Sequence, residues 1–132
     1  MAQIKIFPRA GQIYVCDFDG FREPEMVKKR PVVVVSPRLP YRSEIAAVVP
    51  ISLTEPLHTL PFCFRLSKNY HPDEPDDLPC WVKADMLVNV GLWRLSPFKT
   101  GRRTYAYPTL TQEDLAGVRH AVLCGLGLDK AT

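Results

Sequence analysis

The sequence predicts a mostly β protein of the α+β kind, a small barrel of short strands closed at its end by one helix. Short apolar segments recur along the chain, thirteen prolines are spread from Pro8 to Pro108, and helical periodicity is confined to the end of the sequence. Because proline is excluded from helix interiors and central strands, only short elements fit between the prolines. The length predicts a single domain over residues 1–132.

Three strands are predicted in the N-terminal half. Residues 12–18 alternate between two faces, which is typical of a half-buried strand. Four consecutive valines at 32–35 predict a strand that is buried on both faces, and residues 45–51 form a third apolar segment. The polar loop between the first two strands runs to about Lys29 and contains Pro24, and we expect it to be exposed.

Three further strands are predicted in the second half. Residues 62–66 alternate between apolar and polar positions. Residues 81–88 predict a strand on which Lys83 and Asp85, two positions apart, share one face. Residues 90–95 predict the last short strand.

The end of the chain changes from strand-like to helical periodicity. Thr111 followed three residues later by Asp114 matches the pattern of a helix N-cap. Gly125 and Gly127 predict the end of this helix. Between these signals, apolar residues recur at helical spacing at Leu115, Val118, Val122 and Leu126.

The four cysteines indicate a reducing compartment, because they form no C-x-x-C pair and no signal peptide is found. The apolar runs are too short to span a bilayer, so we expect a cytoplasmic protein without membrane contact. No metal or other cofactor is expected. Histidine and cysteine can bind zinc, but their spacing here matches no standard set of zinc ligands (His58, Cys63, His71 and Cys80).

The net charge of +3 is too small to indicate a nucleic-acid ligand by itself, so its distribution matters more. Six basic residues lie between Arg22 and Arg42, and a second basic run follows in residues 94–103. Folded onto one face, the two segments would attract phosphate. Two separate, solvated loops are the plainer interpretation, and charge alone favours it.

The first of three polar clusters precedes the valine strand. It consists of Glu25 and the run Lys28-Lys29-Arg30. An arginine at the mouth of a buried strand is anchored by its stem and is suited to a planar, bidentate contact with phosphate. The alternative is a surface ion pair between Glu25 and a neighbouring base, which contributes little to stability.

The other two clusters also lie at strands. Ser52 and Thr54 follow the third strand, where hydroxyl groups most often satisfy turn backbone atoms. Lys83 and Asp85 form a pair that can bind phosphate and transfer protons, or a plain ion pair. When each cluster is considered alone, a purely structural role is favoured over a role in chemistry.

Taken together and in order, these segments resemble the MazF/PemK family of toxins, in its longer-loop branch. The resemblance covers about residues 10–95, and Glu25 falls at the position of a glutamate in the family's loop. Four blocks carry it: 11–19 (GQIYVCDFD), 30–37 (RPVVVVSP), 48–52 (VVPIS) and 83–85 (KAD).

The resemblance implies an SH3-like barrel of five to seven strands with a C-terminal helix, usually a homodimer. It implies the toxin of a type II toxin-antitoxin system, a sequence-specific endoribonuclease that cleaves single-stranded mRNA without a metal ion. The ribose 2′-OH attacks the adjacent phosphorus and leaves a 2′,3′-cyclic phosphate and a 5′-OH end. A cognate antitoxin is the implied partner, whose disordered acidic segment would fold across the basic groove.

The resemblance also implies roles for five residues. Arg30 would neutralise the phosphate and Ser52 would hydrogen-bond it, while Glu25 is the candidate base for the 2′-OH. Lys83 and Asp85 would be a further acid/base or phosphate-binding pair. Residues expected to bind the rest of the RNA surround them: Lys28, Lys29, Arg22, Arg38 and Thr54.

Two other functions stay open at this point. A barrel of the same kind can be a non-catalytic toxin or regulator that binds protein, as in inhibition of DNA gyrase, with its function in the C-terminal helix and Arg30 dispensable. The chain can also be an inactive homologue, since Met26 stands where the family usually has glutamine and Leu53 where it often has a second hydroxyl. The position of the polar clusters at strand ends favours RNA chemistry.

Overall fold

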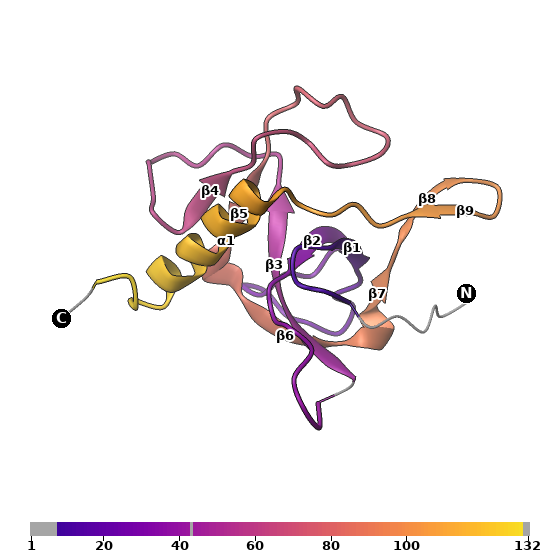
Figure 1. Cartoon of the computed structure of the whole chain (residues 1–132), viewed down its shortest axis with the longest axis horizontal. Helices are drawn as coiled ribbons and strands as arrows, with labels where there is room; N and C mark the ends of the chain where they lie inside the picture. The colour runs from indigo at the N-terminus through magenta and orange to yellow at the C-terminus, as the bar shows by residue number, and fades with distance from the viewer. Residues whose placement is uncertain (1–7, 43, 131–132) are drawn as a thin grey trace.

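Antiparallel strands and one C-terminal helix make up the structure, a computed structural model that describes residues 8–42 and 44–130 (Figure 1). Six strands lie in the order β4-β5-β3-β2-β1-β7, and β6 joins the same sheet by pairing with β3. The strands of this sheet are β1 (Ile13–Cys16), β2 (Arg30–Val34), β3 (Ile45–Ser52), β4 (Cys63–Arg65), β5 (Trp81–Lys83), β6 (Val88–Gly91) and β7 (Leu95–Ser96).

The predicted fold class, mostly β with a C-terminal helix, is confirmed, but the predicted barrel is not closed. Within the described residues, the strands at the two ends of the order, β4 and β7, do not pair with each other. A hairpin of β8 (Phe98–Gly101) and β9 (Thr104–Ala106) forms a second sheet, for which the sequence analysis made no prediction. Most of its residues are exposed, so the apolar alternation of a packed strand is absent from its sequence.

The predicted valine strand lies at the centre of the large sheet, as β2. Pairing with β1 and β3 places Val33 between Ile13 and Val49 on one face of the sheet. Val32 and Val34 point to the opposite face, and all five side chains are buried. The sheet therefore separates two apolar cores, one on each of its faces, which confirms that this strand is buried on both sides.

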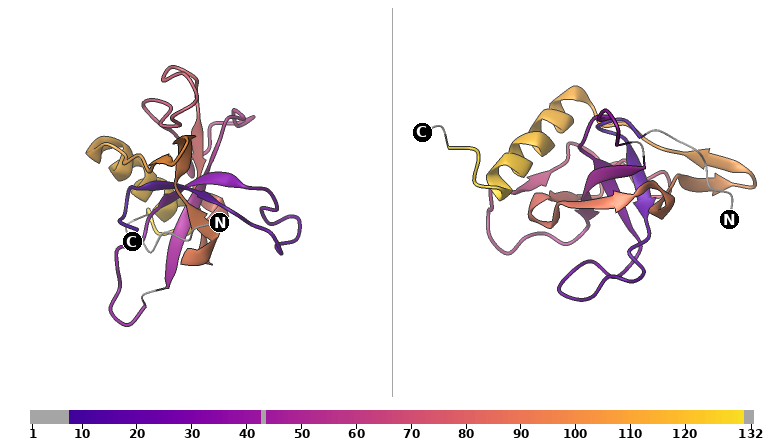
Figure 2. Two further views of the ribbon diagram at one scale, coloured as in Figure 1. Left: turned by 90° about the vertical axis from the view of Figure 1, so that its right-hand side faces the viewer. Right: turned by 90° about the horizontal axis from the view of Figure 1, so that it is seen from below.

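The C-terminal helix α1 (Gln112–Gly125) covers one of these cores, and Figure 2 shows that it lies at the opposite end of the molecule from the β8–β9 hairpin. Thr111 Oγ1 accepts a hydrogen bond from Asp114 N at 3.1 Å, which confirms the predicted N-cap. The helix ends at Gly125, as predicted. Its side chains in the core are Leu115, Val118 and Ala121.

The predicted strand over residues 81–88 is wrong, because a 3-10 helix interrupts it. β5 ends at Lys83, the 3-10 helix η1 (Ala84–Met86) follows, and β6 begins at Val88. Both β5 and β6 pair with the same edge of β3. Their pairing registers on β3 differ by three residues, and the three residues of η1 account for this difference. Asp85 therefore lies exposed on η1 and does not share a strand face with Lys83.

The predicted last strand over residues 90–95 is likewise divided. A second 3-10 helix, η2 (Leu92–Arg94), separates β6, which pairs with β3, from β7, which pairs with β1. The Arg94 guanidinium donates hydrogen bonds to the carbonyl oxygens of Asp17 at 2.9 Å and Asp19 at 2.7 Å. This arginine of the second basic run thus fastens η2 to the end of β1.

A buried carboxylate fastens the loop between β4 and β5, residues 66–80, to α1. Asp114 is 3% exposed and accepts hydrogen bonds from Ser67 N at 3.2 Å, Ser67 Oγ at 2.7 Å and Tyr70 Oη at 2.6 Å. Tyr70 Oη in turn accepts a hydrogen bond from Thr111 N at 3.1 Å. Because its hydrogen bonds replace those to water, the carboxylate can be buried and the long loop is held against the helix.

We expect Asp114→Ala to lower the free energy of unfolding by about 2–3 kcal/mol, because the Ser67 and Tyr70 donors would lose their acceptor, a charged group that is itself buried. Urea denaturation followed by circular dichroism measures this change. Glu113→Ala, an exposed position in the same helical turn, is the control and should cost less than about 1 kcal/mol. Equal losses for the two variants would contradict the role given to Asp114.

Two buried groups predict a loss of stability at alkaline pH. Burial raises the pKa of the Cys16 thiol from 9.0 to about 12, and burial, with Tyr107 nearby, raises the pKa of the Tyr14 phenol from 10.0 to about 12. In the unfolded chain these groups lose their protons first, so the free energy of unfolding falls as the pH rises from about 9 toward 12. Below about pH 8 the groups are almost fully protonated in both states and contribute no pH dependence.

Urea denaturation at pH 8.0 and pH 10.5 tests this prediction, with an expected loss on the order of 2 kcal/mol between them from the thiol. Cys16→Ala removes the thiol and should lose less stability between the two pH values than the unmodified chain does. An equal loss in both proteins would show that the thiol is not the group responsible.

Candidate functional site

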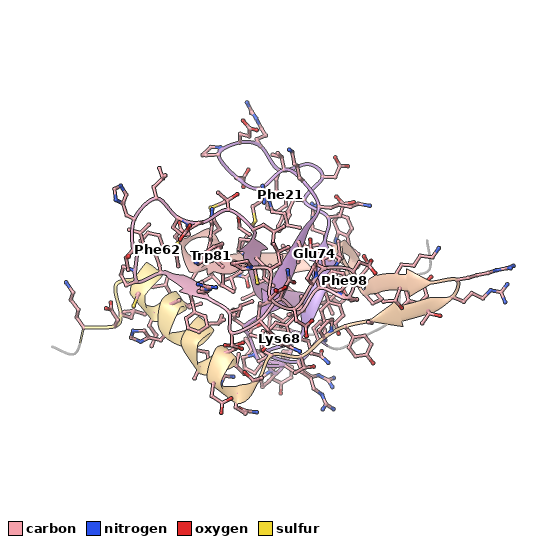
Figure 3. All side chains as sticks on the ribbon, turned by 90° about the horizontal axis from the view of Figure 1, so that it is seen from above. Phe21, Phe62, Lys68, Glu74, Trp81 and Phe98 are labelled. Carbon is pink, nitrogen blue, oxygen red and sulfur yellow. The ribbon has the colours of Figure 1, made fainter. Side chains whose placement is uncertain are left out.

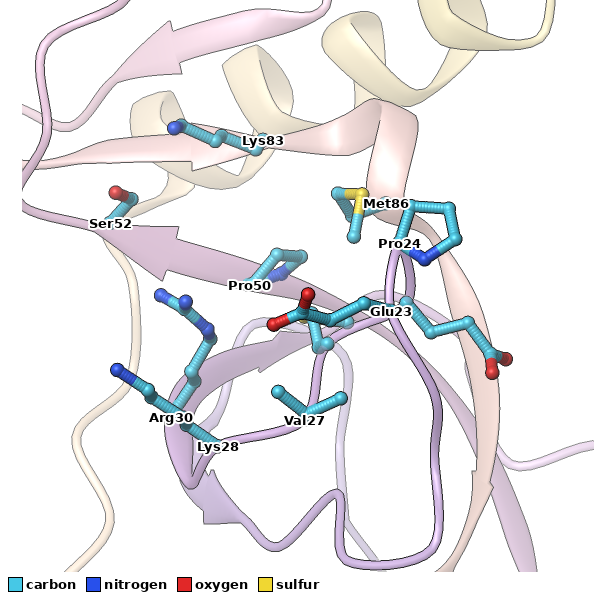
Figure 4. A pocket seen from close by; sticks show the side chains of 11 residues that line it. Glu23, Pro24, Val27, Lys28, Arg30, Pro50, Ser52, Lys83 and Met86 are labelled. Atoms are coloured by element: carbon cyan, nitrogen blue, oxygen red, sulfur yellow. The ribbon is translucent and has the colours of Figure 1, made fainter.

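Two open clefts meet at Arg30 and Ser52, which line both of them. The first cleft, of about 450 Å³, lies between the loop that precedes β2 and the sheet (Figure 4). The second cleft, of about 350 Å³, lies on the other side of the two residues, against the loop of residues 66–80. The residues singled out in the sequence that line one or both clefts are Arg30, Ser52, Glu25, Lys28, Lys83, Lys29 and Thr54.

The register of the central strands brings Arg30 and Ser52 together. Val32 of β2 is opposite Pro50 of β3, Arg30 is the first residue of β2, and Ser52 is the last residue of β3. Two further steps along each antiparallel strand therefore reach Arg30 and Ser52 on the same face. β5 pairs with this end of β3, and Figure 4 shows Lys83 beyond Ser52 on that neighbouring strand.

Arg30 holds a buried hydrogen-bond donor that no protein group satisfies. Within the described residues, its Nε is shielded from solvent and has no hydrogen-bond partner. Figure 4 shows the guanidinium extending from β2 toward the end of β3. A desolvated donor of this kind is costly to leave unpaired, and a bidentate oxyanion such as phosphate is its best-matched partner. Arg30 thus places an unsatisfied donor on a side chain that lines both clefts.

The Ser52 hydroxyl bonds to the backbone of the following turn and is still able to donate a hydrogen bond to a ligand. Its Oγ accepts a hydrogen bond from Thr54 N at 3.1 Å, so the hydroxyl does satisfy the turn that follows β3. A hydroxyl has one proton to donate besides the lone pairs that accept. The bond from Thr54 thus orients the Ser52 hydroxyl and leaves its proton for a ligand in the cleft.

The first cleft has both basic and acidic residues on its walls. Glu25 and Lys28 line it from the loop that precedes β2, and Lys83 lines it from the end of β5. Glu25 Oε1 accepts a hydrogen bond from Arg22 N at 3.0 Å, so the carboxylate is held by the backbone of its own loop. A carboxylate and ammonium groups around an anion site can accept and supply protons.

Three of the predicted site residues lie outside both clefts. Arg22 is exposed on the loop before β2, and Asp85 is exposed on η1. Arg38 lies in the loop after β2 and lines a separate small pocket with Pro37 and Arg42. The second basic run is also removed from the clefts, because its remaining residues lie exposed on the β8–β9 hairpin (Lys99, Arg102 and Arg103).

The second cleft holds functional candidates that the sequence analysis did not identify. Asn69, His71 and Glu74 line it from the loop of residues 66–80, and Phe98 lines it from β8. The rings of His71 and Phe98 meet edge to face, with centroids 4.7 Å apart. No local motif marks these residues. The loop lines the cleft only because Asp114 holds it against α1, and this contact joins residues that are far apart in the sequence.

The described residues contain no group of three or more His, Cys, Asp and Glu side chains placed to hold a metal ion. The cysteines are free thiols. Among the parts of the chain that are described, no helix has the length and apolar character needed to cross a membrane.

The chain matches a known family over most of its length. A sequence model for the family described as "PemK-like, MazF-like toxin of type II toxin-antitoxin system" matches residues 9–122. The comparison with curated proteins gives no significant match.

Solved structures of several toxins share the fold. An endoribonuclease from a mycobacterial species, solved in complex with its cognate antitoxin, has a TM-score of 0.64 and 21% sequence identity, covering 94% of this chain and 99% of its own. MazF from Deinococcus radiodurans has a TM-score of 0.64 and 23% identity, covering 92% of this chain and 98% of its own. The Mycobacterium tuberculosis toxin MazF-mt6 has a TM-score of 0.59 and 18% identity, with coverages of 90% and 99%.

Proposed function

The chain belongs to the family of PemK-like, MazF-like toxins of type II toxin-antitoxin systems, and on this basis we propose that it is an endoribonuclease that cleaves single-stranded mRNA. One observation carries the proposal: Arg30, whose buried Nε has no partner among the described residues, lines both clefts together with Ser52. The structural neighbours described as endoribonucleases support the same activity.

The scissile phosphate binds at the junction of the two clefts. Arg30 donates hydrogen bonds to two of its oxygens, and Ser52 donates a third. These donors become more favourable as negative charge builds up on the pentavalent phosphorus, so they stabilise the transition state more than the bound RNA. Single-stranded RNA suits this site, because its backbone can rotate into the in-line arrangement that a regular helix forbids.

The first cleft holds the nucleotide whose 2′-OH attacks. Glu25 accepts the proton of this hydroxyl, which then forms a bond to phosphorus as the bond to the 5′-oxygen of the next nucleotide breaks. The departing 5′-oxygen takes up a proton from water, which reaches the site through the open clefts. Lys28 and Lys83 neutralise the remaining phosphate charge, and the products are a 2′,3′-cyclic phosphate and a 5′-OH end. The proposed reaction assigns no step to a metal ion. The proposal leaves Asp85 out, because it is exposed outside both clefts.

The biological setting follows from the family. The toxin acts in the cytoplasm as a homodimer and is neutralised by a cognate antitoxin, as the mycobacterial neighbour is found in complex with its own. Lys29 and Thr54 contact the RNA in the second cleft. Arg22 and Arg38, which lie outside the clefts, are left to more distant phosphates of the RNA.

We expect the purified protein to cut a long single-stranded RNA at discrete sites in excess EDTA, leaving cyclic phosphate ends. Arg30→Ala should cut at least about a hundredfold more slowly, because it removes the donors that stabilise the transition state. End mapping and single-turnover rates measure both results. Arg119→Ala, an exposed position on α1 away from the clefts, is the charge-matched control and should cut at the rate of the unmodified chain.

Two results would contradict this proposal. Folded protein that leaves RNA intact would favour a non-catalytic toxin or an inactive homologue, and DNA gyrase inhibition would then be assayed directly. Cleavage by Arg30→Ala at an unchanged rate would keep the activity but remove the assigned mechanism.

Ser52→Ala is expected to slow cleavage by about tenfold or more without changing the cut sites, because a single donor to the phosphate is lost. Ser52→Thr keeps a hydroxyl in the same place and should recover most of the rate. Single-turnover rates of the two variants on one RNA make the comparison. If Ser52→Thr is as slow as Ser52→Ala, the hydroxyl is not the group that matters.

A further inference from the structure

We propose that the second cleft binds the base immediately 3′ of the scissile phosphate and that Glu74 selects guanine there. This inference rests on the proposed ribonuclease function and assigns a specificity to its site. It starts from the observation that Arg30 and Ser52 line both clefts. A phosphate held between them has one cleft on each side, and the RNA backbone has one nucleotide on each side of that phosphate.

Glu25 determines which nucleotide occupies which cleft. It lines the first cleft only, so the ribose whose 2′-OH it deprotonates lies there. That ribose belongs to the nucleotide 5′ of the scissile bond. The leaving 5′-oxygen then points toward the second cleft, which receives the nucleotide on the 3′ side.

The walls of the second cleft suit a planar base. Apolar and aromatic side chains form much of its surface, among them Ile51, Leu53, Tyr70 and Phe98. The Phe98 ring is 4% exposed and meets His71 edge to face, so the half-buried rings of Tyr70 and His71 present the aromatic surface of the cleft. Unstacked bases in single-stranded RNA bind aromatic surfaces of this kind and are read by hydrogen bonds along their edges.

Glu74 is held in place by a buried amide. Asn69 is 4% exposed, its Nδ2 donates a hydrogen bond to Glu74 Oε1 at 3.0 Å, and its Oδ1 accepts one from His71 N at 2.8 Å. Asn69 N also donates to the carbonyl oxygen of Asp76 at 2.9 Å. Since the amide is buried and bonded through both its nitrogen and its oxygen, it holds the Glu74 carboxylate in a fixed orientation at the cleft (Figure 3 labels Glu74 and Phe98).

A fixed carboxylate favours a base with N–H donors. Guanine presents two adjacent donors, N1–H and the N2 amino group, which match the two carboxylate oxygens. Adenine and cytosine offer a single amino group beside an acceptor, and uracil offers one N–H between two carbonyl oxygens. A carboxylate therefore binds guanine most strongly and repels the carbonyl oxygens of uracil.

The test is cleavage of an RNA pool with randomised bases around the cut, followed by sequencing of the fragment ends. The unmodified chain should favour guanine at the first position 3′ of the cut. Glu74→Gln keeps the size of the side chain and an oxygen for Asn69 but replaces one acceptor with a donor, so the preference for guanine over uracil should fall by about tenfold or more. Asp77→Asn, exposed on the same loop and outside the cleft, is the matched control and should leave the preference unchanged.

A binding measurement keeps the inference testable whatever the cleavage rate of the variant. RNA strands with a single 2′-deoxy nucleotide 5′ of the cut lack the attacking hydroxyl, and they differ only in guanine or uracil at the next position. The unmodified chain should bind the guanine strand more tightly, and Glu74→Asp, which shortens the side chain, should lose part of the difference.

The possible failures are distinguishable. Intact RNA with folded, unmodified protein would overturn the proposed function and this inference with it. Cleavage that shows no guanine preference, or a preference that Glu74→Gln leaves unchanged, would overturn this inference alone.

Discussion

The antiparallel pairing of β2 with β3 is the constraint on which the site depends. Val33 and Val49 are opposed in this pairing and completely buried, so a shift by one residue would turn the valines of β2 to the wrong cores. The same register places Arg30, at the start of one strand, beside Ser52, at the end of the other. Hydrophobic burial in the middle of the sheet therefore fixes the geometry of polar groups at its rim.

The second constraint is the attachment of a long loop to the helix through Asp114. Hydrogen bonds from Ser67 and Tyr70 to this carboxylate fasten the loop of residues 66–80 to α1, while Leu66 and Cys80 anchor its two ends in the core. Asn69 then orders the interior of the loop and orients Glu74. The first cleft is thus built from a strand register and the second from a chain of buried polar contacts, which explains why the two differ in how far sequence reveals them.

Sequence patterns predicted the parts of the fold that depend on neighbouring residues. The valine run specified β2, and Thr111 with Asp114 specified the start of α1, because strand burial and helix capping are local. The break at η1 was missed because it depends on how two strands share one edge of β3. For the same reason Asp85 was misplaced. The sequence blocks that resemble the toxin family contain Arg30 and Ser52 and so identified both as candidates. No sequence pattern identified Glu74.

The unpaired Nε of Arg30 has a cost that the fold must bear in the absence of ligand. A buried donor without a partner destabilises a protein by roughly 1–3 kcal/mol, which is a substantial fraction of the net stability of a small domain. The apolar packing of β2 on both faces offsets this cost and keeps the guanidinium in place. An arginine with a carboxylate partner would be more stable but would have to break that ion pair before it could bind phosphate. In the proposed function, the unpaired donor on Arg30 is preorganised for an oxyanion.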